Sequence, residues 1–154
     1  MYRFAIYGKG GIGKSTVTTA LSCAFAEMGL RVLQVGCDPK ADSTLYLHGG
    51  QRIDTMLDVL RQKRDSAELA DLVHVGYKDI VCAEAGGPTP GLGCAGRGIA
   101  ADLPRDNAIS DAEVQGLPVF ETAPDSDYAN AVRNLARKML ADYDKENAHD
   151  SEAQ

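Results

Sequence analysis

A glycine-rich run near the amino terminus constrains the fold of this chain more than any other feature. Four glycines stand between residues 8 and 13, directly after the short apolar segment 4–7. Glycine allows the backbone to curl tightly and to aim several N–H groups at one phosphate. Residues 15–28 then carry apolar side chains at helical spacing. We therefore predict a strand, a phosphate-binding loop and a helix; a glycine-rich turn that merely precedes a helix is the alternative.

The predicted loop gives its polar side chains distinct roles. The helix that follows presents its partial positive charge to the phosphates, and Gly29 ends that helix. We expect Lys14 to reach the terminal phosphates and the Ser15 hydroxyl to ligate Mg²⁺. The residues predicted to bind the nucleotide in this loop are Gly8, Lys9, Gly10, Gly11, Ile12, Gly13, Lys14, Ser15 and Thr16.

Lys9 stands early in the loop, as in the deviant class of phosphate-loop ATPases. In that class this lysine reaches the nucleotide of the partner subunit across a dimer interface. The resemblance implies that hydrolysis needs two chains and that Lys9 acts with Lys14 as a catalytic residue. A solvated loop lysine is the alternative that spacing alone leaves open.

Two later segments resemble the nitrogenase iron protein family, ATP-dependent reductases that deliver electrons to the nitrogenase catalytic component. Residues 32–44, VLQVGCDPKADST, are similar to the second strand and first switch segment of that family. Residues 84–98, EAGGPTPGLGCAGRG, are similar to the segment that carries one ligand of its iron-sulfur cluster. The related light-independent protochlorophyllide reductase protein usually has a histidine where Ala41 stands, which favours the nitrogenase branch.

The resemblance assigns roles to the first switch segment. Asp38 is expected to hold a water of the Mg²⁺ shell or to orient the attacking water, and Asp42 lies on the same segment. Both are predicted catalytic residues, and Lys40 is expected to sense the phosphates or the partner chain. The Asp38-Pro39 pair also suits a simple turn that leaves a strand.

The resemblance also implies a 4Fe-4S cluster on the two-fold axis of a homodimer, with two cysteine ligands from each subunit. Cys94 is the predicted iron ligand. Arg97 resembles an arginine that is ADP-ribosylated in some members and lies where the redox partner docks. Cys23, Cys37 and Cys82 lie in helix or strand candidates and are predicted to be structural, because a buried free cysteine behaves as a small apolar residue.

The resemblance breaks after residue 102. Residues 103–107 look like the adenine-contacting segment from near the carboxyl end of the family, which predicts nucleotide contacts from Pro104, Arg105 and Asp106. A long central stretch is missing between these parts. It would have held the second cluster cysteine and the second switch.

Length and pattern predict one α/β domain over residues 1–154. Residues 1–101 form its family N-terminal part, residues 103–143 its family C-terminal part, and residues 144–154 a frayed tail. The expected fold is a three-layer parallel sheet of the P-loop NTPase type, with helices on both faces and its central strands missing. The predicted strands are 4–7, 32–37, 80–83 and 119–122, and the predicted helices are 15–28, one around 111–113, and 126–143.

Charge and hydropathy limit the partners. The net charge of −6 disfavours nonspecific nucleic-acid binding, and no apolar run approaches membrane-spanning length. The amino terminus has no signal-peptide pattern, so we expect a cytoplasmic protein. The expected partners are a second copy of the chain and a nitrogenase or nitrogenase-like catalytic component, with no nucleic acid and no membrane.

Two functions remain. The first is an ATP-dependent iron-sulfur electron-transfer protein that couples MgATP hydrolysis to electron delivery to a partner reductase. The second is a nucleotide-binding remnant that keeps the loop and the 104–106 pocket but holds no cluster. A partition-type or septum-site ATPase shares the early lysine, yet such proteins lack the run at residues 93–98.

Overall fold

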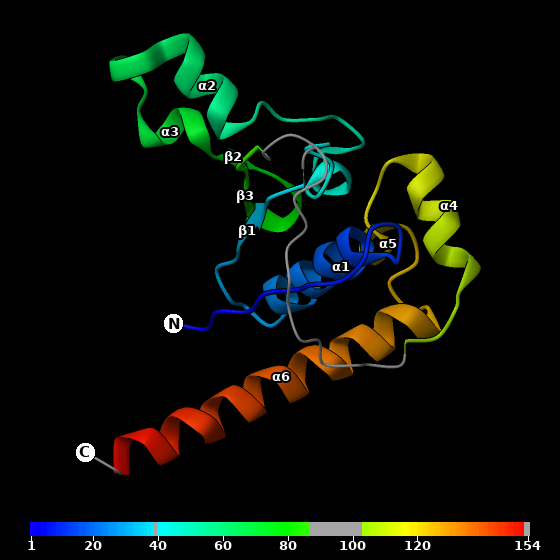
Figure 1. Ribbon diagram of the computed structural model, residues 1–154. Coiled ribbons are helices and arrows are strands. Elements are labelled where there is room, and N and C mark those ends of the chain that lie inside the picture. Colours follow the sequence, from blue (N-terminus) through cyan, green and yellow to red (C-terminus); the bar gives the residue numbers. More distant parts are fainter. Residues whose placement is uncertain (39, 87–102, 153–154) are drawn as a thin grey trace.

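A computed structural model of the chain describes residues 1–38, 40–86 and 103–152. In these ranges the elements follow in this order: α1 (Lys14–Glu27), β1 (Leu33–Gly36), α2 (Met56–Lys63), α3 (Leu69–Leu72), β2 (His74–Val75), β3 (Val81–Glu84), α4 (Asn107–Gln115), α5 (Val119–Thr122) and α6 (Asp127–Glu152). Figure 1 shows α1 between the small sheet and α6. None of the helices described is both long and apolar enough to cross a membrane.

Helix α1 forms the centre of the core and confirms the helix predicted after the glycine-rich loop. Gly13 precedes the helix with φ 86°, and Gly29 follows it with φ 80°, so both ends use backbone conformations that favour glycine. The side chains that α1 buries completely or nearly so include Ala20, Leu21, Cys23 and Ala24, and the core they share includes Val132 and Ala136 of α6.

The sheet has the order β1-β3-β2. Strands β1 and β3 pair in parallel, with Leu33 opposite Val81 and Gly36 opposite Glu84, whereas β2 pairs antiparallel to β3. The α/β class is confirmed, but the prediction of a wholly parallel sheet is wrong. Only the short turn at residues 77–79 joins β2 to β3, and a parallel connection needs a crossover of a dozen or more residues.

One face of β1 is open to solvent. The apolar side chains of Leu33 and Val35 are 57% and 56% exposed, whereas Gln34 and Gly36 are buried on the other face. The prediction of helices on both faces is therefore wrong for this strand. Helix α1 packs on one face, and the described residues supply no layer that buries the other.

Residues 4–7 belong to no strand, so the predicted first strand is wrong. In the sheet order β1-β3-β2 the free edges are the outer edges of β1 and β2, and residues 4–7 pair with neither. The segment instead lies along α1 (Figure 1), where the Phe4 ring stacks on Phe25 with centroids 5.5 Å apart. Tyr143 of α6 meets Tyr2 and Phe4 edge-on, so aromatic contacts replace strand pairing.

Two C-terminal predictions also change. Residues 119–122 form helix α5 rather than a strand, because the adjacent side chains of Val119 and Phe120 are both buried in one core, whereas neighbours in a strand point to opposite faces. Helix α6 continues to Glu152, beyond the predicted end at residue 143, since the residues that follow include good helix formers. The predicted helix around residues 111–113 is confirmed as α4.

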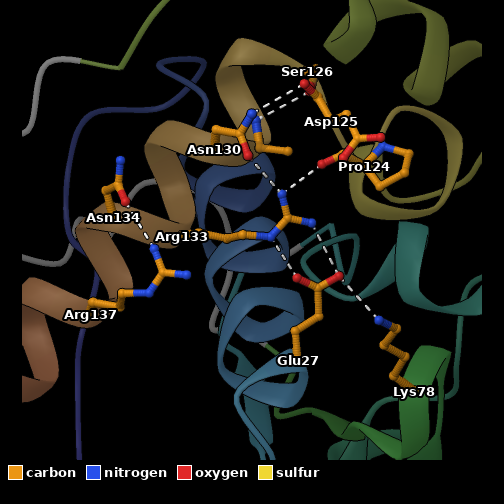
Figure 2. A network of polar contacts seen from close by, with 10 residues as sticks. Glu27, Lys78, Pro124, Asp125, Ser126, Asn130, Arg133, Asn134 and Arg137 are labelled. Atoms are coloured by element: carbon orange, nitrogen blue, oxygen red, sulfur yellow. Dashed lines mark hydrogen bonds and ion pairs between the residues drawn. The ribbon is translucent and has the colours of Figure 1, made fainter.

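A polar network ties the end of α1 to α6 (Figure 2). The Arg133 guanidinium donates from Nε and Nη2 to the two carboxylate oxygens of Glu27, at 2.7 and 3.3 Å. Lys78 donates to the same carboxylate at 3.1 Å, and the Arg133 guanidinium lies 4.8 Å from the Phe120 ring centroid. Hydrogen bonding to Arg133 lowers the pKa of Glu27 below its ordinary value of 4.5.

Replacing Arg133 with glutamine should lower the free energy of unfolding by about 1 kcal/mol at neutral pH, the range of a well-formed pair near the surface. The contribution of a carboxylate with a lowered pKa is present above its ordinary pKa and is lost as the pH falls through the lowered one. The difference between wild type and Arg133→Gln in urea unfolding should therefore shrink below about pH 4. A difference that stays constant down to pH 3 would contradict this role of the pair.

Candidate functional site

The glycine-rich loop leads directly into the start of α1. Residues 8–13 are exposed. Gly11 and Gly13 have φ values of 77° and 86°, in a backbone region that residues other than glycine rarely adopt. Gly13 occupies the N-cap position of α1 and has no side chain that could cap the helix. The first turn of the helix holds no acidic residue. The first N–H groups of α1 therefore keep their capacity to bind an anion.

The side chain of Lys14 contacts the backbone of the glycine-rich loop. Lys14 Nζ donates a hydrogen bond to the backbone carbonyl oxygen of Lys9 at 3.0 Å, so the ammonium group folds back over the loop. An ammonium carries three donors on a flexible stem, which leaves two for other acceptors. The structure thus places the charge of Lys14 at the loop that we expect to bind phosphate.

Helix α4 lies beside the first turn of α1. The Thr16 hydroxyl donates to Glu113 Oε1 at 2.9 Å. A recess between the two helices is lined by Thr16, Thr19, Ala20, Tyr46, Ile109, Ala112, Glu113, Leu117, Pro118 and Val119. Helix α4 of the C-terminal part therefore packs against α1. Thr16 and Glu113 are 97 residues apart in the sequence, so local sequence patterns do not predict this contact.

The first switch segment begins with a tight turn. Asp38 Oδ1 accepts from the Lys40 backbone N–H, and the Asp38 carbonyl oxygen accepts from the Ala41 N–H, both at 2.9 Å. Ala41 has a φ of 49°, which an alanine rarely adopts. The turn interpretation of Asp38 is thus confirmed, and the catalytic roles of Asp38 and Asp42 and the sensing role of Lys40 stay predictions.

The end of this segment is anchored by buried polar groups. The Ser43 carbonyl oxygen accepts from Gln34 Nε2 at 2.7 Å and from Thr19 Oγ1 at 3.4 Å. Glu84 Oε1 accepts from both the N–H and the hydroxyl of Thr44, at 2.8 and 2.9 Å. Sequence reasoning missed Glu84, although an acidic residue at the end of an apolar strand is an unusual signal.

Asp106 caps two helices in this structure. Its Oδ1 accepts from the Ala108 N–H at 2.9 Å at the start of α4, and its Oδ2 accepts from the Tyr128 N–H at 3.3 Å at the start of α6. Pro104 and Arg105 are exposed. The predicted adenine contacts of these residues stay predictions. An aspartate directly before a helical pattern is itself a capping signal.

Replacing Asp106 with alanine should lower the free energy of unfolding by about 1–2 kcal/mol, the usual cost of losing a helix N-cap. Asp106→Asn keeps one acceptor oxygen and should cost less. Urea unfolding followed by circular dichroism measures both. Equal stability of wild type and Asp106→Ala would refute the double cap.

The described cysteines differ from the predicted pattern at one position. Cys23 and Cys82 are fully buried, and burial raises the pKa of each thiol to about 12, as expected of structural cysteines. Cys37 is exposed, because β1 ends at Gly36, so the prediction of a buried structural role is wrong there. Cys94 and Arg97 lie outside the described residues.

The sequence of the loop and switch region matches a known family. Residues 2–103 match the family described as "4Fe-4S iron sulfur cluster binding proteins, NifH/frxC family". This chain belongs to the NifH/frxC family. Over 102 residues it is 55% identical to a protein called "Nitrogenase iron protein" from Methanospirillum hungatei JF-1. That match covers 66% of this chain and 36% of the relative, so the chain spans little more than a third of that relative's length.

The NifH/frxC match ends at residue 103. It contains the glycine-rich loop, the switch segment and the segment with Cys94, which confirms the family resemblance inferred from those motifs. The predicted likeness of residues 103–143 to the carboxyl end of the family stays a prediction.

Proposed function

We propose that this chain is the nucleotide-binding part of an ATP-dependent iron-sulfur electron-transfer protein, which couples MgATP hydrolysis to electron delivery to a partner reductase. The observation that carries the proposal is the exposed glycine loop at the start of α1, with the Lys14 ammonium folded over it. Membership of the NifH/frxC family supports the same function.

The donors of this loop suit the nucleotide. Backbone N–H groups of residues 10–16 and the Lys14 ammonium would hold the phosphates, and the Ser15 hydroxyl would hold Mg²⁺. Magnesium neutralises the charge that develops on the phosphates during phosphoryl transfer. Asp38 and Asp42 would orient water near the ion, and Lys40 would sense the phosphates.

The proposed unit is a homodimer in the cytoplasm. Lys9 would reach the nucleotide of the partner subunit, and a nitrogenase or nitrogenase-like catalytic component would receive the electron. Arg97 would lie at that docking surface and is a candidate for ADP-ribosylation. The exposed apolar face of β1 supports the view that a central family segment is missing.

The cluster fits the described residues poorly. Cys94 is the one proposed ligand from each chain, and a 4Fe-4S cluster needs four. Cys23 and Cys82 are fully buried, and burial raises the pKa of each thiol to about 12, which disfavours the thiolate form that iron binds. The described residues contain no group of three or more candidate metal ligands. With Cys94 as the one proposed ligand from each chain, two chains supply two of the four ligands, which favours a second candidate, a nucleotide-binding remnant without cluster or redox activity.

Iron analysis separates the two candidates. The chain is purified and reconstituted without oxygen, and iron, sulfide and the EPR spectrum after dithionite reduction are measured. About two irons per chain, absent from Cys94→Ser, would support the electron-transfer protein, since one cluster would be shared by two chains. Iron well below one per chain would leave the nucleotide-binding remnant.

A further inference from the structure

Glu84 is an unusual residue for a strand end. It is fully buried, alone among the acidic side chains that the structure describes, and its Oε2 has no hydrogen-bond partner. That oxygen rests against Gly36 of β1, where even a methyl group would collide with it. Burying a half-satisfied carboxyl costs folding free energy, so packing alone does not explain its presence.

The satisfied oxygen of Glu84 fixes the end of the switch segment. Thr44 donates twice to Oε1, from its backbone N–H and from its hydroxyl. Burial raises the pKa of the Glu84 carboxyl above its ordinary value, the hydrogen bonds from Thr44 oppose that shift, and the charge of Asp42 adds to it. The carboxyl therefore holds Thr44 and lies within electrostatic range of Asp42.

The same segment is tied to α1 on its other side. Thr19 Oγ1 donates to the Ser43 carbonyl oxygen at 3.4 Å. Thr19 follows Ser15 by four residues, so the two side chains share one face of the helix. Ser43 is thus tied to the face of α1 that carries Ser15, and Thr44 is tied to β3.

We propose that Glu84 is a positioning residue: by holding Thr44 it fixes the place of Asp42, from which Asp42 acts on the Mg²⁺ of a nucleotide bound at Ser15. This inference rests on the proposed function, because it requires a magnesium nucleotide at the glycine loop. Glu84 itself touches neither nucleotide nor ion in this account, and acts through Thr44.

The test measures the magnesium dependence of ADP binding. Isothermal titration calorimetry gives the Kd for ADP in excess Mg²⁺ and the Kd for ADP in EDTA. The ratio of these two Kd values measures how much Mg²⁺ contributes to ADP binding. The variants are Glu84→Leu, which removes the acceptor, Glu84→Gln, which keeps it, and Thr44→Val, which removes only the hydroxyl donor. Glu121→Gln on the exposed surface of α5 is the matched control.

The wild-type ratio of Kd in EDTA to Kd in Mg²⁺ should be about tenfold or more, and Glu84→Leu should reduce it to about one. The Kd in EDTA should stay within about twofold, since the loop itself is unchanged. Glu84→Gln should restore the wild-type ratio, and Glu121→Gln should retain it. Thr44→Val should give a ratio between those of the wild type and Glu84→Leu. If Glu84→Leu fails to fold, the comparison of Thr44→Val with the wild type tests the proposal.

The outcomes separate the inference from the function on which it rests. Wild-type chain that binds no ADP would overturn both. ADP binding with no magnesium effect in the wild type, or with a wild-type ratio in Glu84→Leu and Thr44→Val, would overturn the positioning role alone. An equal loss of affinity in Mg²⁺ and in EDTA would also overturn it, because that is the signature of general damage.

Discussion

Replacing Gly36 with alanine should destabilise this chain more than any other substitution considered. A Cβ at this position would lie 2.0 Å from Glu84 Oε2 and 2.5 Å from its carboxyl carbon. The carboxyl is fully buried and cannot move aside without breaking its two hydrogen bonds to Thr44. Overpacking plus the loss of these bonds should lower the free energy of unfolding by about 3–4 kcal/mol.

A double-mutant cycle isolates the cause of this loss. In a Glu84→Ala background the added methyl meets no carboxyl, so Gly36→Ala should cost about 1 kcal/mol or less there. Gly10→Ala is the matched control, since a Cβ at Gly10 would meet nothing within 4 Å. Urea unfolding measures the four chains of the cycle and the Gly10→Ala control. The same cost for Gly36→Ala in both backgrounds would contradict the contact with Glu84.

The second large effect is on binding rather than stability. Replacing Lys14 with alanine should weaken MgADP binding by about a hundredfold, which corresponds to about 2.7 kcal/mol and lies within the range of a charge-assisted hydrogen bond. The helix should remain intact, because the Lys14 side chain makes one hydrogen bond to the loop and none to the core. Calorimetric titration with MgADP measures the change, and circular dichroism checks the fold.

Lys138 on the exposed surface of α6 provides the matched lysine control. Lys138→Ala should bind MgADP as the wild type does. If both variants lose affinity equally, the effect comes from net charge rather than from the loop. If neither loses affinity, Lys14 does not contact the phosphates.

Local signals in the sequence were enough for much of the fold. The glycines around α1 and its apolar spacing predicted that helix, and apolar runs predicted β1 and β3. The wrong secondary-structure predictions fall on segments whose conformation depends on tertiary contacts. Residues 4–7 have the composition of a strand, yet they pair with no strand, and Phe4 instead contacts the rings of Phe25 and Tyr143. The run at 119–122 begins with two apolar residues, but both of these adjacent side chains are buried, which favours a helical turn.

The candidate site divides in the same way. The phosphate-binding loop could be predicted from the sequence because its candidate ligands lie within nine consecutive residues, 8–16. The bond between Thr16 and Glu113, the anchoring of Thr44 by Glu84 and the double cap by Asp106 join residues that are far apart in the chain. Single-sequence patterns contain no information on which distant polar groups meet, so these contacts required the structure.

Calorimetric titration of the wild-type chain with MgADP directly tests nucleotide binding at the glycine loop. We expect a saturable site of about one nucleotide per chain, together with a rise in Tm as the nucleotide is added. A chain that is folded by circular dichroism but shows neither binding heat nor a Tm shift at millimolar MgADP would contradict it.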